Sequence, residues 1–248
     1  MKPPRIRFSI FTLLVITAVI AVGVMLYQRY VVRLAAEDEF TITIATQEFR
    51  GDTFQRMAKL SAQYPDFGRL PGAVSWAVLG GQYDLCERFL EAGGKADDRY
   101  VQNQSAPLVF AIMQNRRDLA KLLIEHGAEV QAPLDHGGFT HAAPTYLHLA
   151  AQYDRAEMCE LLLKHDVDLN APNIQGETAL HLAIRSRNIE VVRLLLEHEA
   201  DDSTHPKLPS PLALAMNLRD EAVRTQTSTY GYDEIILLLE DHYPPTNP

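Results

Sequence analysis

Cysteine is scarce in this sequence of 248 residues, which contains only Cys86 and Cys159. The motifs of several enzyme classes are missing: no G-x-S-x-G, no phosphate-binding Walker loop, no dinucleotide fingerprint and no H-E-x-x-H. These absences remove the motif-based reasons to expect a serine hydrolase, a nucleotide-binding enzyme or a zinc protease. The sequence therefore predicts a protein that is not an enzyme, with no catalytic residue, no resident metal and no cofactor.

Basic residues are also scarce once the N-terminus is passed. The whole chain has 23 basic and 32 acidic residues, a formal charge of −9. Five of the basic residues lie in the first 36 positions, and no acidic residue precedes Glu37. The remainder of the chain thus has 18 basic and 32 acidic residues, a formal charge of −14. A body this acidic repels phosphate backbones, so nucleic acid is not expected as a partner. Without a substrate motif, a small-molecule substrate is not expected either.

One long apolar run stands near the N-terminus. Residues 8–27 read FSIFTLLVITAVIAVGVMLY and contain no charge. At 1.5 Å per residue, about 20 helical residues span the roughly 30 Å hydrocarbon core of a bilayer. The run predicts a basic tail at 1–7, a transmembrane helix at 8–30 and contact with a membrane through 8–27. The flanking charges favour a single-pass protein with its body on the outer side. A cleaved signal peptide is the alternative.

The segment 31–71 is expected to join this anchor to the rest of the chain. Phe40 to Ala45 (FTITIA) alternates like a short strand, although no partner strand is evident. Asp52 is a candidate N-cap for a helix with Phe54, Met57 and Leu60 on one face. We interpret that helix as a cap on the domain that follows, because terminal repeats need a polar outer side.

The most informative pattern is a repeat of 33 residues. The stretch from Thr145 reads TYLHLAAQYDRAEMCELLLKHDVDLNA, and the stretch from Thr178 reads TALHLAIRSRNIEVVRLLLEHEADD. Self-similarity at a fixed period marks a stack of equivalent units. The matched positions of the motif are Thr145, Leu147, His148 and Ala150 in one copy and Thr178, Leu180, His181 and Ala183 in the other.

These two copies resemble the ankyrin repeat, whose signature is T-P-L-H-x-A followed by a leucine-rich helix. More divergent copies extend the pattern, so five repeats are expected to start near 72, 106, 145, 178 and 210, within a domain at 72–243 followed by a tail at 244–248. The resemblance implies an all-α solenoid of stacked helix-turn-helix units with hairpin loops, here preceded by the transmembrane helix. Cys86 and Cys159 would then lie two repeats apart, about 16–20 Å, too far for a disulfide.

The turn between the two helices of each repeat requires a positive φ in this family, usually met by glycine. The corresponding residues are Gly81, Asn115, Asp154 and Arg187. Glycine, asparagine and aspartate tolerate a left-handed conformation. Arg187 does not fit as well, and mild strain or an altered turn is expected there.

Two segments depart from the period. The hairpin at 133–144 (PLDHGGFTHAAP) is longer than the others, and the fifth repeat has an insertion between its helices at 217–232. The insertion predicts an extended first helix, a loop at 225–231 and Asp233 as N-cap of the final helix. Insertions in solenoids commonly map to loops on one face, which is often the binding face.

Six of the nine histidines fit the repeat pattern. His148 and His181 belong to the T-x-L-H motif, while His126, His165, His198 and His242 each close a second helix, where the imidazole meets free carbonyls. Asp135, His136 and His141 share the long hairpin and form the one combination resembling a zinc site, but they lack a cysteine partner. A metal-dependent enzyme using residues 133–144 is retained as a remote alternative.

The resemblance implies binding to another, unidentified protein through hairpin tips and exposed first-helix positions. The sequence therefore predicts a membrane-anchored interaction module or scaffold; a secreted or periplasmic inhibitor or protector of an enzyme is the alternative. The predicted partner-binding residues are Leu134, His136, Phe139, Gln152, Tyr153, Ile174, Gln175, Glu177, Arg185 and Ser186. Met113 occupies an equivalent exposed position.

Overall fold

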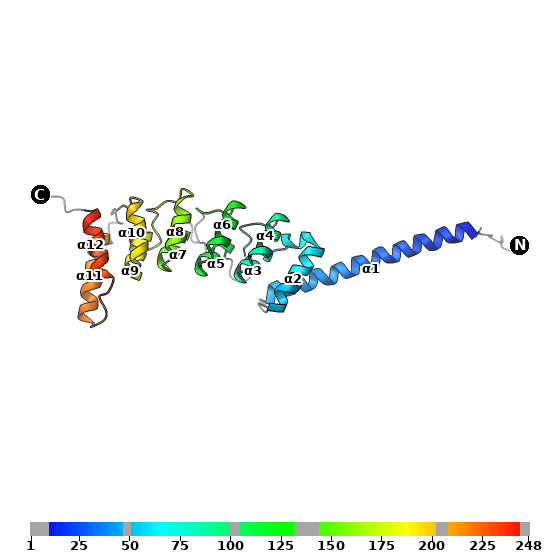
Figure 1. Ribbon diagram of the computed structural model, residues 1–248, viewed down its shortest axis with the longest axis horizontal. Helices are drawn as coiled ribbons and strands as arrows, with labels where there is room; N and C mark the ends of the chain where they lie inside the picture. Colours follow the sequence, from blue (N-terminus) through cyan, green and yellow to red (C-terminus); the bar gives the residue numbers. More distant parts are fainter. Residues whose placement is uncertain (1–9, 47–50, 100–104, 132–143, 202–207, 244–248) are drawn as a thin grey trace. The chain divides into compact units, whose positions relative to one another are not determined.

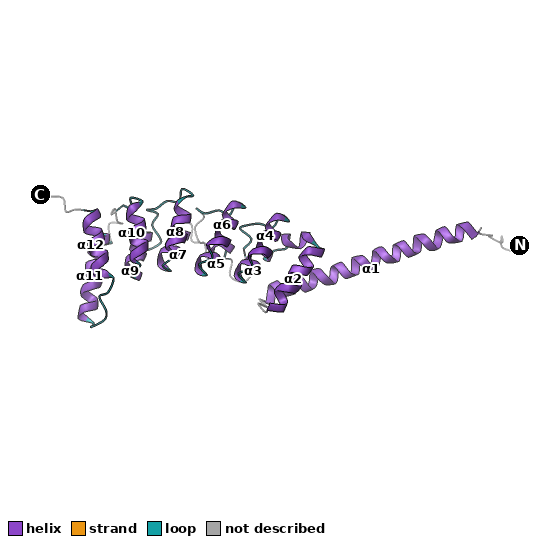
Figure 2. Ribbon diagram, viewed as in Figure 1, coloured by secondary structure: helices purple, strands orange, loops and turns teal. Residues whose placement is uncertain are grey.

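The computed structural model describes residues 10–46, 51–99, 105–131, 144–201 and 208–243, with the side chains of the first helix described from residue 21 to 44. Within these ranges the regular structure is helical and no strand occurs (Figures 1 and 2). The chain divides into two units, one ending at Phe67 and the other beginning at Gly68. The all-α class predicted from the sequence is confirmed for the described residues.

The first unit contains a long helix, α1 (Ile10–Thr46), and a shorter one, α2 (Gly51–Gln63), followed by the start of the 3-10 helix η1 (Pro65–Arg69). The predicted strand at 40–45 is wrong, because this segment continues α1. Phe40 and Ile44 are four residues apart, so the helix places both on one face, where they are buried. Phe40 packs against Phe67 with 5.3 Å between ring centroids. A lone strand would leave its backbone groups unpaired, whereas the helix pairs them internally.

The prediction of a single-pass membrane protein is contradicted. In the part of the chain that the structure describes, no helix combines the length and the apolar composition needed to cross a membrane. The described side chains of α1 include the cations Arg29 and Arg33 and the acidic run Glu37 to Glu39 on one continuous helix.

The second unit is a row of helix pairs (Figure 1). In the first four pairs, the first helix has seven or eight residues and the second has eight or nine. Each pair contacts the next through both its helices, so every repeat is covered by its neighbours. The pairs are α3 (Ala73–Leu79) with α4 (Tyr83–Glu91), α5 (Pro107–Met113) with α6 (Arg117–Glu125), α7 (Tyr146–Gln152) with α8 (Ala156–Leu163), α9 (Ala179–Ser186) with α10 (Ile189–Glu197), and α11 (Pro211–Arg224) with α12 (Tyr232–His242).

The core of the second unit recurs from pair to pair. One position in each first helix is a fully buried alanine, and its small side chain lets neighbouring helices approach closely. A larger apolar residue fills the matching place at the start of each second helix. The alanines are Ala77, Ala111, Ala150, Ala183 and Ala215; the larger residues are Leu85, Leu119, Met158, Val191 and Ile235. Cys86 and Cys159 are free and buried, as predicted; burial raises the pKa of each thiol to about 12.

The turn between the helices keeps one conformation in the first four pairs. Gly81 has φ 67°, Asn115 and Asp154 have φ 56°, and Arg187 has φ 60°. The alternative of an altered turn at Arg187 is therefore wrong, since this residue adopts the left-handed conformation. A left-handed residue with a Cβ carries a cost of about 1–2 kcal/mol. The expected strain is present, and Arg187 retains the geometry of the glycine turn despite it.

Side chains from one pair donate hydrogen bonds to carbonyls at the turn end of the preceding first helix. Arg116 Nη1 donates to the Gly81 carbonyl at 2.8 Å, and Arg155 Nη2 donates to the Met113 carbonyl at 3.2 Å. Asn188 Nδ2 donates to the Ala151 carbonyl at 2.6 Å. The last carbonyls of a helix have no partner within it. Arg155 and Asn188 therefore complete the first helix of the preceding pair, while Arg116 binds the turn that follows the first helix of its preceding pair.

The insertion in the last pair extends its first helix, as predicted. α11 has 14 residues and projects past the row of α3, α5, α7 and α9 in Figure 1. The predicted N-cap of the final helix is wrong: Gly231, with φ 90°, occupies that position, and Asp233 lies in the first turn of α12. A carboxylate in the first turn still lies near the positive end of the helix dipole. Asp233 therefore still stabilises the start of α12, although it is not the N-cap.

Candidate protein-interaction surface

The T-x-L-H motif forms a small buried network at the start of α7. The backbone N–H of Thr145 donates to His148 Nδ1 at 3.1 Å, so this nitrogen is an acceptor. The other ring nitrogen, Nε2, then carries the proton and donates to the Glu177 carbonyl at 2.9 Å, in the hairpin before the next pair. At the start of α9 the backbone N–H of Thr178 donates to His181 Nδ1 in the same way, at 3.3 Å. The histidines of the motif are structural, and they require the neutral imidazole.

We expect the free energy of unfolding to fall as the pH is lowered below about 6.5. Burial lowers the pKa of both His148 and His181, and backbone hydrogen bonding at Glu177 and Pro209 opposes this only in part. Above pH 6.5, the ordinary pKa of histidine, His148 and His181 are neutral in both the folded and the unfolded chain, and the network is intact. Below this pH the two histidines bind protons more readily in the unfolded chain than in the folded chain, so protonation favours unfolding. Urea unfolding at pH 7.5 and 5.5 measures the difference. In a double His148→Asn, His181→Asn variant the dependence over this range should be flatter, and an unchanged slope would contradict the assignment.

Glu177 was predicted to be an exposed contact residue, but it is buried, with 8% of its surface exposed. Its carboxylate accepts from Arg185 Nε at 2.7 Å and from Asn173 Nδ2 at 3.3 Å. Its backbone N–H donates to Asn173 Oδ1 at 2.9 Å, and its carbonyl accepts from His148. Glu177 therefore holds the hairpin between α8 and α9 together and does not present a side chain to solvent.

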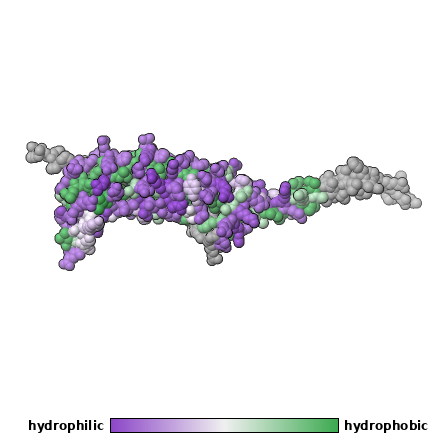
Figure 3. Space-filling model, in the orientation of Figure 1, coloured by the Kyte–Doolittle hydropathy of each residue, from purple (hydrophilic) through white to green (hydrophobic). Residues whose placement is uncertain are grey.

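The remaining described residues of the predicted face are exposed: Gln152, Tyr153, Ile174, Gln175, Arg185 and Ser186. Tyr153 is 42% exposed at the end of α7, and Met113 is 42% exposed at the end of α5. Ile174, at 58%, lies on the hairpin. The bond from Arg185 to Glu177 lays the exposed end of α9 beside the base of that hairpin. Helix-end and hairpin residues thus belong to adjoining surface. In the view of Figure 3, hydrophilic and hydrophobic side chains are both present on the surface of the helix pairs.

The other predicted residues cannot be placed on this surface. Leu134, His136 and Phe139 lie outside the described residues, as do Asp135 and His141 of the candidate zinc site. Among the residues that are described, no group of three or more histidine, cysteine, aspartate or glutamate side chains is arranged to hold a metal ion.

Residues 133–205 match the family model "Ankyrin repeats (3 copies)". The chain contains ankyrin repeats. A comparison with curated proteins gave no significant match. The matched range includes α7 to α10, and helix pairs with the same buried alanine continue on both sides of it. Ankyrin repeats generally mediate binding to other proteins, which agrees with an exposed surface of mixed apolar and polar side chains.

Beyond the predicted face, the last helix pair exposes Val223, Tyr230 and Leu237, which are 61%, 79% and 65% exposed. The sequence located the insertion that contains the first two, but its side-chain exposure was not predicted. The available signal was the composition of residues 225–231 (TQTSTYG), where one aromatic residue stands among small polar ones.

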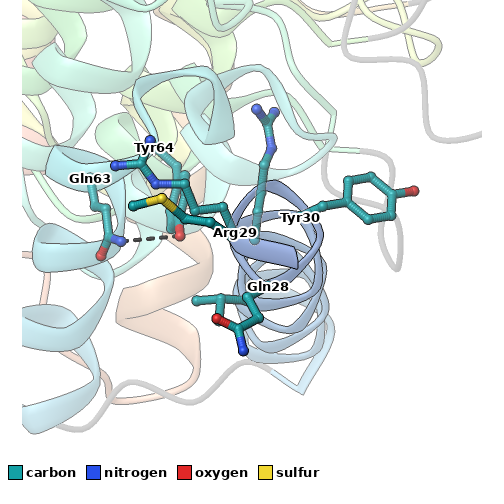
Figure 4. Close-up of a pocket in the computed structure, with 8 residues that line it drawn as sticks. Gln28, Arg29, Tyr30, Gln63 and Tyr64 are labelled. Carbon is teal, nitrogen blue, oxygen red and sulfur yellow. Dashed lines mark hydrogen bonds between the residues drawn. The ribbon is translucent and has the colours of Figure 1, made fainter. Parts of the chain in front are cut away.

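A separate groove of about 590 Å³ lies within the first unit (Figure 4). Its lining comes from α1 and the end of α2, and includes Arg29, Tyr30 and Tyr64. Gln63 Nε2 donates to the Tyr64 hydroxyl at 3.0 Å, while Arg33 forms an ion pair with Asp66. The groove is open, and most of its lining consists of long polar side chains. None of the predicted site residues lines it.

Proposed function

We propose that the ankyrin repeats bind a protein partner through the face formed by Met113, Gln152, Tyr153, Ile174, Gln175, Arg185 and Ser186. The observation that supports this most strongly is the exposure of Met113 and Tyr153 at the ends of α5 and α7 and of Ile174 on the hairpin before α9. Among the described residues of the stack, the other exposed large apolar side chains lie in the last helix pair: Val223, Tyr230 and Leu237. Met113, Tyr153 and Ile174 could each have been polar without loss to the core. Their exposure is explained by contact with a partner, since aromatic and apolar anchors dominate interface energies.

The arrangement is suited to a protein surface more than to a small ligand. The face crosses three helix pairs, so a partner meets side chains from α5, α7, α9 and the intervening hairpin. Arg185 is held in place by Glu177, and its ion pair leaves the side chain 49% exposed. A fixed cation beside apolar residues favours a partner that combines an apolar patch with a carboxylate.

We expect a Tyr153→Ala, Ile174→Ala double variant to bind the partner at least tenfold more weakly. Loss of an interface anchor costs about 1–2 kcal/mol or more, and 1.4 kcal/mol corresponds to a factor of ten. The partner is first isolated with the full chain and purified, and its dissociation constant is measured by calorimetry. Lys121→Ala is the matched control, because Lys121 is exposed on α6 and pairs with a neighbour on that helix, Glu125. Equal affinity of the double variant and the wild type, with both folded, would show that this face is not the binding site.

A further inference from the structure

Helix α1 has two different faces. Ala36, Phe40 and Ile44 recur at intervals of four residues and are buried within the first unit, where α1 contacts α2. At 3.6 residues per turn, the opposite face of the same helix carries Val31 and Leu34, which are 43% and 42% exposed. Most of the stability of a helix in a protein comes from packing one of its faces. The described side chains of α1 that precede Ala36 are exposed, so this part of the helix lacks such packing within one chain.

The exposed face has the spacing of a coiled-coil seam. Val24, Tyr27, Val31 and Leu34 are separated by three, four and three residues, and all four are among the exposed apolar side chains. A heptad places the two valines at a positions and the tyrosine and leucine at d positions. In the sequence the same spacing continues upstream at Ile10, Leu13, Thr17 and Ile20, all within the bounds of α1. The spacing therefore covers about 3.5 heptads, a length that indicates a coiled coil.

The charges of α1 are compatible with pairing between identical helices. Arg29 and Arg33 occupy f and c positions, on the side of the helix that lines the groove of the first unit. The e and g positions that flank the described seam hold Gln28, Tyr30 and Ala35, none of which is charged. These flanking positions set partner choice by charge in a coiled coil. With uncharged residues there, two copies of α1 bring no like charges together along the seam.

The seam also indicates how many helices pair and in which direction. β-branched residues at a with leucine at d favour a parallel pair of helices, and Val24, Val31 and Leu34 follow this rule. The next a position is Asp38, which is exposed. Two Asp38 carboxylates would face each other in a parallel pair, and like charges repel. The contact is therefore expected to end after Leu34, before the part of α1 that packs against α2.

We propose that α1 pairs with α1 of a second copy of this chain in a parallel, two-stranded coiled coil whose described seam is Val24, Tyr27, Val31 and Leu34. The second copy covers the face that α2 leaves open. The dimer presents two sets of helix pairs, so a partner with two binding sites is held with an affinity above that of either site alone. The inference does not depend on the proposed function, because it concerns other residues and needs no partner protein.

Sedimentation equilibrium of the purified full chain measures the association, and the expected mass is that of two chains. Val31→Glu places a pair of carboxylates in the seam and should raise the dimer dissociation constant at least 30-fold. Val32→Glu is the matched control, because the same substitution one position along falls outside the seam, at a side chain that is 58% exposed. Its dissociation constant should stay within threefold of the wild type. A monomeric wild type, or an equal loss in the two variants, overturns the proposal.

Disulfide formation tests the register without adding a charge. Cysteine is introduced in turn as Val31→Cys, Leu34→Cys and Val32→Cys, while the natural Cys86 and Cys159 are buried. Identical seam positions face each other in a parallel pair, and a disulfide requires Cα atoms within about 7 Å. Mild oxidation at one protein concentration should give covalent dimers at 31 and 34 and at least tenfold less at 32. Equal yields at the three positions, or none at 31 and 34, overturn the seam.

Asp38→Asn tests the parallel direction. In a parallel pair this substitution removes two opposed carboxylates, and asparagine at an a position is compatible with a two-stranded coiled coil. The dimer dissociation constant should therefore fall about threefold. In an antiparallel pair the two Asp38 residues lie far apart along the helices, and an unchanged dissociation constant would overturn the parallel arrangement.

Discussion

Replacing Trp76 with alanine is expected to lower the free energy of unfolding of the N-terminal repeats by about 3–5 kcal/mol, the cost of truncating a buried aromatic side chain. Trp76 lies in α3 and is fully buried, and it is among the largest enclosed side chains in the chain. Its helix, α3, contacts α4 and α5. Alanine would leave a cavity at that end of the stack, which the short helices cannot close without losing contact with the next pair.

The damage should remain local. In a repeat protein each unit contacts only its neighbours, so stability is close to a sum of repeat and interface terms. Circular dichroism during urea unfolding should therefore show an early transition from α3 and α4, followed by a later one from α7 to α12. Trp76→Phe is the matched control, because it keeps an aromatic ring and should lower the free energy of unfolding by less than Trp76→Ala does. A single transition shifted as a whole would mean that the stack unfolds as one cooperative body.

We expect Gly94→Ala to destabilise the same region by about 3 kcal/mol, the upper end for overpacking a tight site. A Cβ at Gly94 would lie 2.5 Å from the Gly68 carbonyl oxygen, 2.7 Å from the Phe89 carbonyl oxygen and 2.9 Å from Val74 Cγ2. Two of these atoms are backbone, so relief requires the chain to move. Thermal unfolding followed by circular dichroism measures the effect.

The control for this prediction is Gly127→Ala, in the next repeat. A Cβ at Gly127 would meet nothing within 4 Å, but the residue has φ 88°. Gly127→Ala should therefore lower the free energy of unfolding only by the penalty for alanine in the left-handed conformation, about 1–2 kcal/mol. If the two variants were equally destabilised, the close approach at Gly94 would not be the cause. Ala128 occupies the position equivalent to Gly94 without difficulty, which shows that the requirement comes from the chain entering the first repeat.

The repeat fold was predictable because it depends on short local patterns that recur. Thr145, His148 and Ala150 recur at Thr178, His181 and Ala183, and the structure gives both copies the same capping interaction and the same buried alanine. The periodicity even identified the one turn with an unsuitable residue. It did not predict that Arg187 would keep the turn, because the compensating contact is made with Tyr232, 45 positions away and outside the repeat pattern.

The candidate surface was predicted only in part. Exposed positions such as Tyr153 follow from register, and Ile174 follows from its place on a hairpin. Glu177 has the same hairpin context, yet its carboxylate is drawn inward by Arg185 and Asn173. Whether a polar hairpin residue faces solvent depends on partners that only the folded chain brings together. The strand expected at 40–45 failed for a similar reason. Alternation is compatible with a helix when Phe40 and Ile44 are buried on one face and Phe40 packs against Phe67.

The hydrogen bonds from Arg116, Arg155 and Asn188 to the preceding helices give the stack a temporal order during synthesis. A ribosome adds about 5–20 residues per second, so a repeat of this length follows its predecessor by roughly 2–7 seconds. During that interval the newest first helix on the nascent chain has carbonyls whose donor has not yet been made. The newest unit therefore stays incomplete until the next pair is made. Arg187 differs, because its partners, Ser228 and Tyr232, belong to the pair that follows it.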